Sequence, residues 1–114
     1  MPVRLDVVSA GAYVIHCAGE FDQDTVPDLT GVVAAVRDRA GAGRLVVDVR
    51  DVTFADSAFL NCLLGLRAAG ELVLVGPLPA QLRRLLEITG ALTLFTLAPS
   101  VRAAHGGPDP SVPA

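Results

Sequence analysis

Short apolar runs alternate with polar breaks along the chain, and their spacing predicts alternating strands and helices. Residues 4–8 and 12–18 are two such runs, separated by Ser9-Ala10-Gly11, which is typical of a β-hairpin. Both faces of the second run are partly apolar, so we expect this strand to lie inside a sheet. Gly19-Glu20-Phe21-Asp22 is expected to break it.

A helix is predicted to start at Thr25. The hydroxyl of Thr25 and the acid at Asp28 resemble a capping box, with Pro27 tolerated in the first turn. An apolar stripe then follows at helical spacing, formed by Leu29, Val32, Val33 and Val36. Gly41 is expected to end this helix.

The most strongly patterned stretch runs from residue 44 to residue 70. Leu45-Val46-Val47-Asp48-Val49 is rich in β-branched residues and predicts a strand covered on both faces. A short turn and a helix over 57–70 follow, with Asp56-Ser57 at the helix start, which is the beginning of a βαβ unit. In open α/β sheets, functional residues tend to lie at this carboxyl edge of the strands.

The rest of the chain repeats the alternation. Leu72-Val73-Leu74-Val75 predicts a second buried strand, closed by Gly76-Pro77. A helix follows over 78–89 and a last strand over 92–97, with a helical turn near 100–104. Leu78, Leu82, Leu85 and Leu86 form the apolar stripe of the 78–89 helix, and Gln81 is expected to face water.

The predicted order is therefore β-β-α-β-α-β-α-β, with a short final helix. This order is typical of a single α/β domain with a mixed, mostly parallel sheet and right-handed crossovers. We expect the domain to span residues 1–104. Residues 105–114 have no apolar periodicity and are expected to form a disordered tail.

Composition narrows the function classes. The net charge of −3 disfavours nonspecific nucleic-acid binding. No apolar run reaches the roughly 18–20 residues of a membrane span, and the N-terminus lacks a signal-peptide pattern, so we expect a cytoplasmic protein. Cys17 and Cys62 are more simply two buried free thiols than a disulfide or redox pair.

Catalytic and metal motifs are missing from the sequence. The two histidines are far apart, and no CxxC or HExxH pattern predicts a metal or cofactor site. His16 is more simply a core or rim histidine than a ligand. A serine hydrolase is disfavoured because Ser57 has no evident histidine base. Five acids gather near the strand ends, and we favour roles in caps and strand ends for Asp22, Asp24, Asp48, Asp51 and Asp56.

Asp56-Ser57 remains as the candidate site. Either residue is a good helix N-cap by type, which alone would explain the pair structurally. The helix behind it is unusually apolar, however. If Leu60, Leu63 and Leu64 face the core, then Phe59, Cys62 and Leu66 lie at or near the surface as a candidate protein-binding patch. A phosphate on Ser57 would sit at the positive end of the helix dipole and would place charge beside that patch.

These motifs together resemble the STAS domain of bacterial anti-anti-sigma factors. The resemblance rests on residues 19–22, on the strand at 45–49, on residues 52–60, and on residues 72–76 and 88–90. It covers about residues 3 to 104. After the aspartate, the common family pattern is Ser-Ser-Gly-Leu, whereas this chain has Ser57-Ala58-Phe59-Leu60.

The resemblance implies a function. Ser57 falls on the family's phosphorylatable serine and Asp56 on the aspartate before it. Unmodified members bind an anti-sigma factor that is usually also a serine kinase, which releases a sigma factor for transcription; phosphorylation reverses the binding and a phosphatase resets it. The Glu20-Phe21-Asp22 segment lies in the region that members use to contact the kinase. The partner-binding residues expected here are Glu20, Phe21, Asp22, Asp56, Ser57, Ala58, Phe59 and Cys62.

Two alternatives remain open. One is a STAS-like module without phosphorylation that binds a small ligand or supports a larger regulatory or transport complex. The other is the disfavoured serine hydrolase. For an anti-anti-sigma factor, we expect no enzymatic activity, no cofactor and no direct contact with nucleic acid or membrane.

Overall fold

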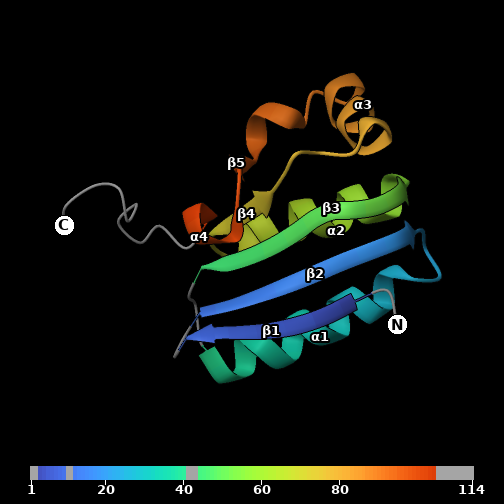
Figure 1. Cartoon of the computed structure of the whole chain (residues 1–114). Coiled ribbons are helices and arrows are strands. Elements are labelled where there is room, and N and C mark those ends of the chain that lie inside the picture. Colours follow the sequence, from blue (N-terminus) through green and yellow to red (C-terminus); the bar gives the residue numbers. More distant parts are fainter. Residues whose placement is uncertain (1–2, 10–11, 41–43, 105–114) are drawn as a thin grey trace.

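The fold is a five-stranded mixed sheet with helices on both faces (Figure 1). The computed structural model describes residues 3–9, 12–40 and 44–104. The sheet order is β1-β2-β3-β4-β5, with β1 and β2 antiparallel and the other pairs parallel. The elements are β1 (Val3–Ser9), β2 (Ala12–Phe21), α1 (Val26–Ala40), β3 (Leu45–Ala55), α2 (Ser57–Ala69), β4 (Leu72–Val75), α3 (Ala80–Ile88), η1 (Leu92–Leu94), β5 (Thr96–Ala98) and α4 (Val101–Ala104).

This architecture confirms the predicted α/β class and the predicted order of elements. The hairpin, the internal position of β2 and the strand over 72–75 are also confirmed. The predicted last strand over 92–97 is wrong in part, because a 3-10 turn occupies Leu92–Leu94 and the strand follows at Thr96–Ala98. The predicted turn residues 10 and 11, the stop at Gly41 and the tail over 105–114 lie outside the described residues.

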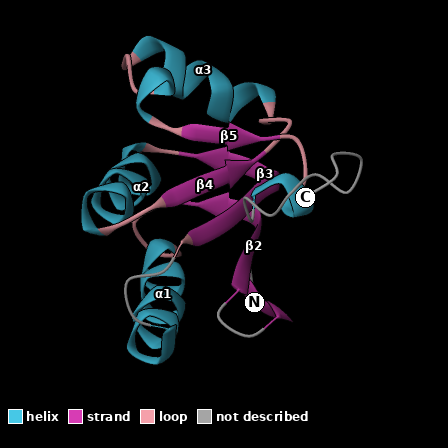
Figure 2. Ribbon diagram, turned by 90° about the vertical axis from the view of Figure 1, so that its left-hand side faces the viewer, coloured by secondary structure: helices cyan, strands magenta, loops and turns pink. Residues whose placement is uncertain are grey.

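The core has two layers. α1 and α2 cover one face of the sheet, and α4 lies on the opposite face near β4 and β5, as Figure 2 shows. Leu29, Val33 and Val36 of α1 are buried as their spacing predicts, and Val32 is partly buried. The α4 face is a smaller cluster built mainly from Val14, Val46, Val73, Val75, Ala98 and Ala104. The sheet is therefore held by aliphatic packing on both sides.

β3 is longer than its apolar run predicts. The predicted turn between Val49 and Asp56 is wrong, because β3 continues to Ala55, and β2 likewise continues through the predicted break to Phe21. From His16 to Ala18 the register on β3 advances from Asp48 to Asp51, and from Gly19 to Glu20 it advances from Val52 to Phe54. Each irregularity is a β-bulge that places one extra residue on β3.

The bulges explain why the sequence looks broken there. Val49 and Val52 both point into the core although they are three positions apart, so the alternation of apolar and polar residues is lost. On β2, Gly19 has a φ of +88° at the second irregularity. Only glycine adopts that left-handed conformation without strain.

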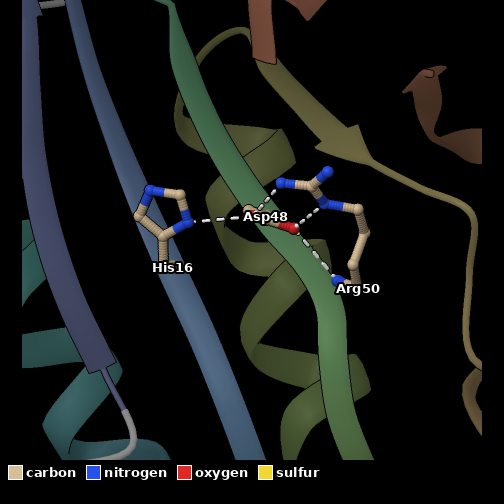
Figure 3. Close-up of polar contacts among 3 residues, drawn as sticks. All are labelled: His16, Asp48 and Arg50. Carbon is tan, nitrogen blue, oxygen red and sulfur yellow. Dashed lines mark hydrogen bonds and ion pairs between the residues drawn. The ribbon is translucent and has the colours of Figure 1, made fainter. Parts of the chain in front are cut away.

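A buried carboxylate lies at the first bulge. Asp48 of β3 has a side chain only 4% exposed, and Figure 3 shows it between His16 of β2 and Arg50 of β3. Asp48 Oδ1 accepts hydrogen bonds from the Arg50 backbone N at 3.1 Å and from Arg50 Nε at 2.9 Å. Asp48 Oδ2 accepts from Arg50 Nη2 at 2.8 Å and lies 2.8 Å from His16 Nδ1. The carboxylate therefore satisfies a backbone N–H at the bulge and ties β3 to β2.

These contacts keep Asp48 ionised. Desolvation by burial raises the pKa of Asp48, but the hydrogen bonds from Arg50 and His16 and the Arg50 charge outweigh it and lower the pKa to about 2. An ionised carboxylate can only accept hydrogen bonds, so His16 Nδ1 must carry a proton in this contact.

The placement of α2 differs from its prediction. Phe59 and Leu66, which we expected at the surface, are buried at 0% and 8% exposure, and Cys62 and Leu64 are half-buried. The Phe59 ring packs against the ring of Phe21 at a centroid distance of 4.9 Å. The prediction of an exposed apolar stripe on α2 is therefore wrong. Most apolar side chains of α2 are buried in the core between the helices α1 and α2 and the sheet.

Replacing Asp48 should test the bulge contact. We expect Asp48→Asn to lower the free energy of unfolding at pH 7 by about 2 kcal/mol, because the folded state lowers the pKa of Asp48 from 3.8 to about 2. Because a lowered carboxyl pKa stabilises the fold only above it, the difference from wild type should shrink as pH falls from about 4 to about 2. Urea titrations across this range measure it. Exposed Asp51→Asn is the matched control, and a wild-type advantage that persists unchanged to pH 2 would contradict the assignment.

Phe59→Ala tests the corrected placement of α2. Removing a fully buried aromatic side chain typically costs about 3–5 kcal/mol, so urea unfolding should show a loss in that range. Phe54→Ala is the matched control, because Phe54 is 43% exposed and its removal should cost much less. Equal losses in the two variants would mean that Phe59 is not a core residue.

Candidate functional site

Ser57 is the first residue of α2 and follows directly on the end of β3. Asp56 is the N-cap, and its Oδ1 accepts hydrogen bonds from the backbone N of Ala58 at 2.9 Å and of Phe59 at 3.4 Å. Because Asp56 takes the cap, the Ser57 side chain is left at the surface. Its hydroxyl has no hydrogen-bond partner within the described residues, so it is accessible for modification.

The end of β2 lies beside the start of α2. Phe21 pairs with Ala55, and the Asp56 backbone N donates to Phe21 O at 3.2 Å. Because the two strands run parallel, the residues that follow each strand emerge at the same edge of the sheet. Glu20 and Asp22 are therefore brought next to Asp56 and Ser57.

The turn after β2 is held by its own polar groups. The Asp22 carboxylate accepts hydrogen bonds from the backbone N of Asp24 at 2.8 Å and of Thr25 at 3.1 Å. The Thr25 hydroxyl donates back to Glu20 O at 3.0 Å. The predicted capping box of Thr25 and Asp28 is therefore wrong: Thr25 turns back toward β2, and Asp22 supplies the carboxylate that orders this turn.

Gln81 of α3 helps to fix the end of β3, although the sequence predicts that this side chain faces water. Its side-chain amide forms two hydrogen bonds with the backbone of Ala55, from Ala55 N to Oε1 at 2.8 Å and from Nε2 to Ala55 O at 2.7 Å. β4 ends opposite Asp48, so Ala55 has no β4 neighbour, and the Gln81 amide takes the place of a neighbouring strand. No local pattern marks this role, because the partner is 26 residues away.

The predicted partner-binding residues divide by exposure. Five of them have accessible surface at this edge of the sheet, and we name them the Ser57 edge: Glu20, Asp22, Asp56, Ser57 and Ala58. Phe21 and Phe59 are fully buried beneath it. Because both side chains are fully buried, they cannot contact a partner directly as expected. They instead pack against each other in the core beneath the Ser57 edge. Cys62 is half-buried one turn further along α2.

The Ser57 edge combines carboxylates with a helix N-terminus. Glu20, Asp22 and Asp56 contribute negative charge, and the amino end of α2 contributes a partial positive charge. No cluster of three or more His, Cys, Asp or Glu side chains within the described residues could hold a metal ion. The Asp22 and Asp56 carboxylates act on backbone N–H groups, as the cap interpretation of these acids predicts.

Other candidate groups lie elsewhere. His16 is paired with Asp48 at the first bulge, as a rim histidine, and is not hydrogen-bonded to Ser57. Both cysteines are free. Burial, with smaller contributions from Cys62 and Asp48, raises the pKa of Cys17 to about 12, and burial also raises the pKa of Cys62. Thiols with raised pKa values are poor nucleophiles.

None of the helices within the described residues is long and apolar enough to cross a bilayer.

Comparison with known proteins gives a family match. The family model described as "Mlab, STAS domain" matches residues 6–96. A search of curated proteins finds no match.

Several solved structures share the fold. The anti-sigma factor antagonist SpoIIAA in its unphosphorylated form is 19% identical, with a TM-score of 0.73 over 89% of this chain and 91% of that chain. An anti-sigma factor antagonist from Mycobacterium paratuberculosis is 28% identical, with a TM-score of 0.72 over 90% of this chain and 88% of that chain. The Bacillus cell fate determinant SpoIIAA in its phosphorylated form is 20% identical, with a TM-score of 0.64 over 89% of this chain and 95% of that chain.

The family match extends from within β1 to the first residue of β5, so it takes in both segments that form the Ser57 edge. Because this match covers more than half of the chain, the chain belongs to the STAS domain family.

Proposed function

We propose that this protein is an anti-sigma factor antagonist whose binding is switched by phosphorylation of Ser57. The observation that carries the proposal is the exposed Ser57 hydroxyl at the start of α2, which has no hydrogen-bond partner among the residues that the structure describes and lies beside the Glu20–Asp22 turn. In its unmodified form, the protein binds an anti-sigma factor that is also a serine kinase, and a sigma factor is released for transcription. A phosphatase restores the unmodified form.

The Ser57 edge suits docking because it is already ordered. Asp56 caps α2, Gln81 fixes the end of β3, and Asp22 orders the turn after β2. A partner that binds here therefore orders few additional groups, and this lowers the entropic cost of association. The Phe21–Phe59 ring contact below the edge holds both segments against one core.

Phosphorylation would change the charge of this edge with little effect on the fold. A phosphate on Ser57 adds about −1.5 to −2 charges at pH 7. The amino end of α2 tolerates negative charge, and the exposed side chain leaves room for the group. A partner packed against Ser57 would have to desolvate that charge beside Glu20, Asp22 and Asp56, so it would lose affinity.

The comparisons support this proposal. The STAS domain match covers most of the described chain, and a structure of similar fold, SpoIIAA, has been solved in phosphorylated and unphosphorylated forms. The departure at Phe59 does not change the docking surface, because that ring lies in the core. We propose a cytoplasmic, non-enzymatic regulator in bacteria that needs no cofactor.

A charge-mimicking substitution tests the switch. We expect Ser57→Asp to keep the wild-type melting temperature within a few degrees but to weaken binding to the cognate kinase by about tenfold or more. Calorimetric titration with the purified kinase measures the affinity. Ser57→Ala is the control and should bind like wild type but accept no phosphate. Wild-type affinity in Ser57→Asp would argue against the mechanism.

A substitution on the neighbouring turn tests whether both segments form one surface. The Glu20 side chain is exposed and forms no hydrogen bond within the described residues, so Glu20→Arg should leave stability nearly unchanged. We expect the variant to weaken kinase binding by about tenfold through altered charge. Glu87→Arg on α3 is the control, because Glu87 is exposed and forms only a surface ion pair. If the Glu20 and Glu87 variants bound equally well, the Glu20–Asp22 turn would lie outside the interface.

A further inference from the structure

A cavity lies at the end of the sheet opposite Ser57. It has a volume of about 640 Å³ and opens where β3, β4 and β5 begin, between the end of α2, η1 and α4. In Figure 1 this is the end of the sheet near α4, whereas β2 and β3 end at the opposite end of the sheet, where α2 follows β3. Small-molecule sites typically occupy about 300–1,000 Å³, so the cavity is large enough for a ligand.

Arg44 forms one wall of the cavity and is held by two elements. Its Nε donates to Glu71 Oε2 at 2.6 Å, and its Nη1 donates to Ala104 O at 3.2 Å. The guanidinium is therefore fixed between the start of β4 and the end of α4. Its Nη2 has no hydrogen-bond acceptor within the described chain.

Arg67 forms a second wall. This residue lies in the last turn of α2, and its Nε donates to the carbonyl oxygen of Leu94 in η1. Both Nη groups of Arg67 lack acceptors among the described residues. Each of the two guanidinium groups is thus anchored by some of its N–H donors. The remaining donors have no acceptor within the described chain and lie at the same cavity. Arginine in such a setting pairs well with carboxylate and phosphate oxygens.

The net charge of the lining is that of a site for a single anion. Glu71 offsets the charge of Arg44, so the lining side chains carry one net positive charge, that of Arg67. The partial negative charge at the carbonyl end of α2 reduces it but does not cancel it. The other lining residues have apolar side chains except Gly70 and Thr96, although polar atoms make up more of the cavity surface than apolar atoms. Leu94 and Leu97 have 44% and 43% of their surface exposed although both are large hydrophobic residues.

We propose that this cavity binds a small amphipathic anion. Its carboxylate or phosphate group pairs with the free guanidinium donors of Arg67 and Arg44, and its apolar body covers Leu94 and Leu97. Contact with water is then removed from two exposed leucines, and the unused arginine donors gain acceptors. The site uses no residue of the Ser57 edge, so it stands whether or not Ser57 is phosphorylated.

Chemical-shift titration of the full ¹⁵N-labelled chain tests this site. The probes are octanoate, octyl phosphate, octanol and inorganic phosphate, each up to about 1 mM. We expect at least one of the two amphipathic anions to shift the amides of Gly70, Thr96 and Ala104 without shifting that of Ser57. Whichever of octanoate and octyl phosphate binds more tightly identifies the head group. Octanol and inorganic phosphate should bind at least about tenfold more weakly, because each lacks one half of the ligand.

Variants locate the binding. Arg67→Gln should weaken binding of the amphipathic anion by about tenfold or more, and Ala103→Phe, which adds bulk to the cavity wall, should block it. Arg84→Gln on α3 is the matched control, because Arg84 is exposed and outside the cavity. Unchanged binding in Ala103→Phe, equal binding of octanol and octanoate, or no shift with either anion would overturn the proposal. Arg67→Gln removes the contact between Arg67 and η1 and could unfold the protein. Ala103→Phe leaves that contact in place, so it tests the site independently.

Discussion

The parallel pairing of β2 with β3 positions the other elements of the domain and both segments of the Ser57 edge. It continues past the end of β4 to the pair Phe21 and Ala55, and both chains leave the sheet at that point. The Asp56 N–H then bonds to the Phe21 carbonyl, so α2 begins beside the end of β2. If the β2–β3 pairing ended at Val49, the Glu20–Asp22 turn and Ser57 would not be held side by side on one surface.

Maintaining that ladder requires buried polar and aromatic contacts. Two bulges on β3 allow Val49 and Val52 to enter the same core, and the Asp48 carboxylate takes the backbone N–H at the first bulge. The low pKa of Asp48 means that its ion pair with Arg50 is present at neutral pH. Further along, Phe21 and Phe59 join the end of β2 to the first turn of α2. Stability and the geometry of the Ser57 edge therefore share the same contacts.

Sequence reasoning predicted the elements better than their ends and faces. The alternation of strands and helices, the start of α2 and the core stripe of α1 follow from local periodicity, which is why they are confirmed. Bulges abolish that periodicity, so β3 beyond Val49 resembled a turn. α2 is apolar nearly all round, so its pattern does not show which face meets the sheet, and for this reason the sequence predicts Phe59 at the surface although it is buried. Gln81 and the Arg44–Arg67 cavity depend on residues distant in sequence, and no local pattern indicates such contacts.

Charge on the Ser57 hydroxyl decides whether a partner can dock on a surface that is already ordered. The most direct measurement is mass spectrometry of the complex between this protein and its purified cognate kinase, before and after ATP is added. We expect one added phosphate, located on Ser57, and separation of the modified protein from the kinase. A phosphate located elsewhere, or a complex that stays intact with Ser57 phosphorylated, would contradict it.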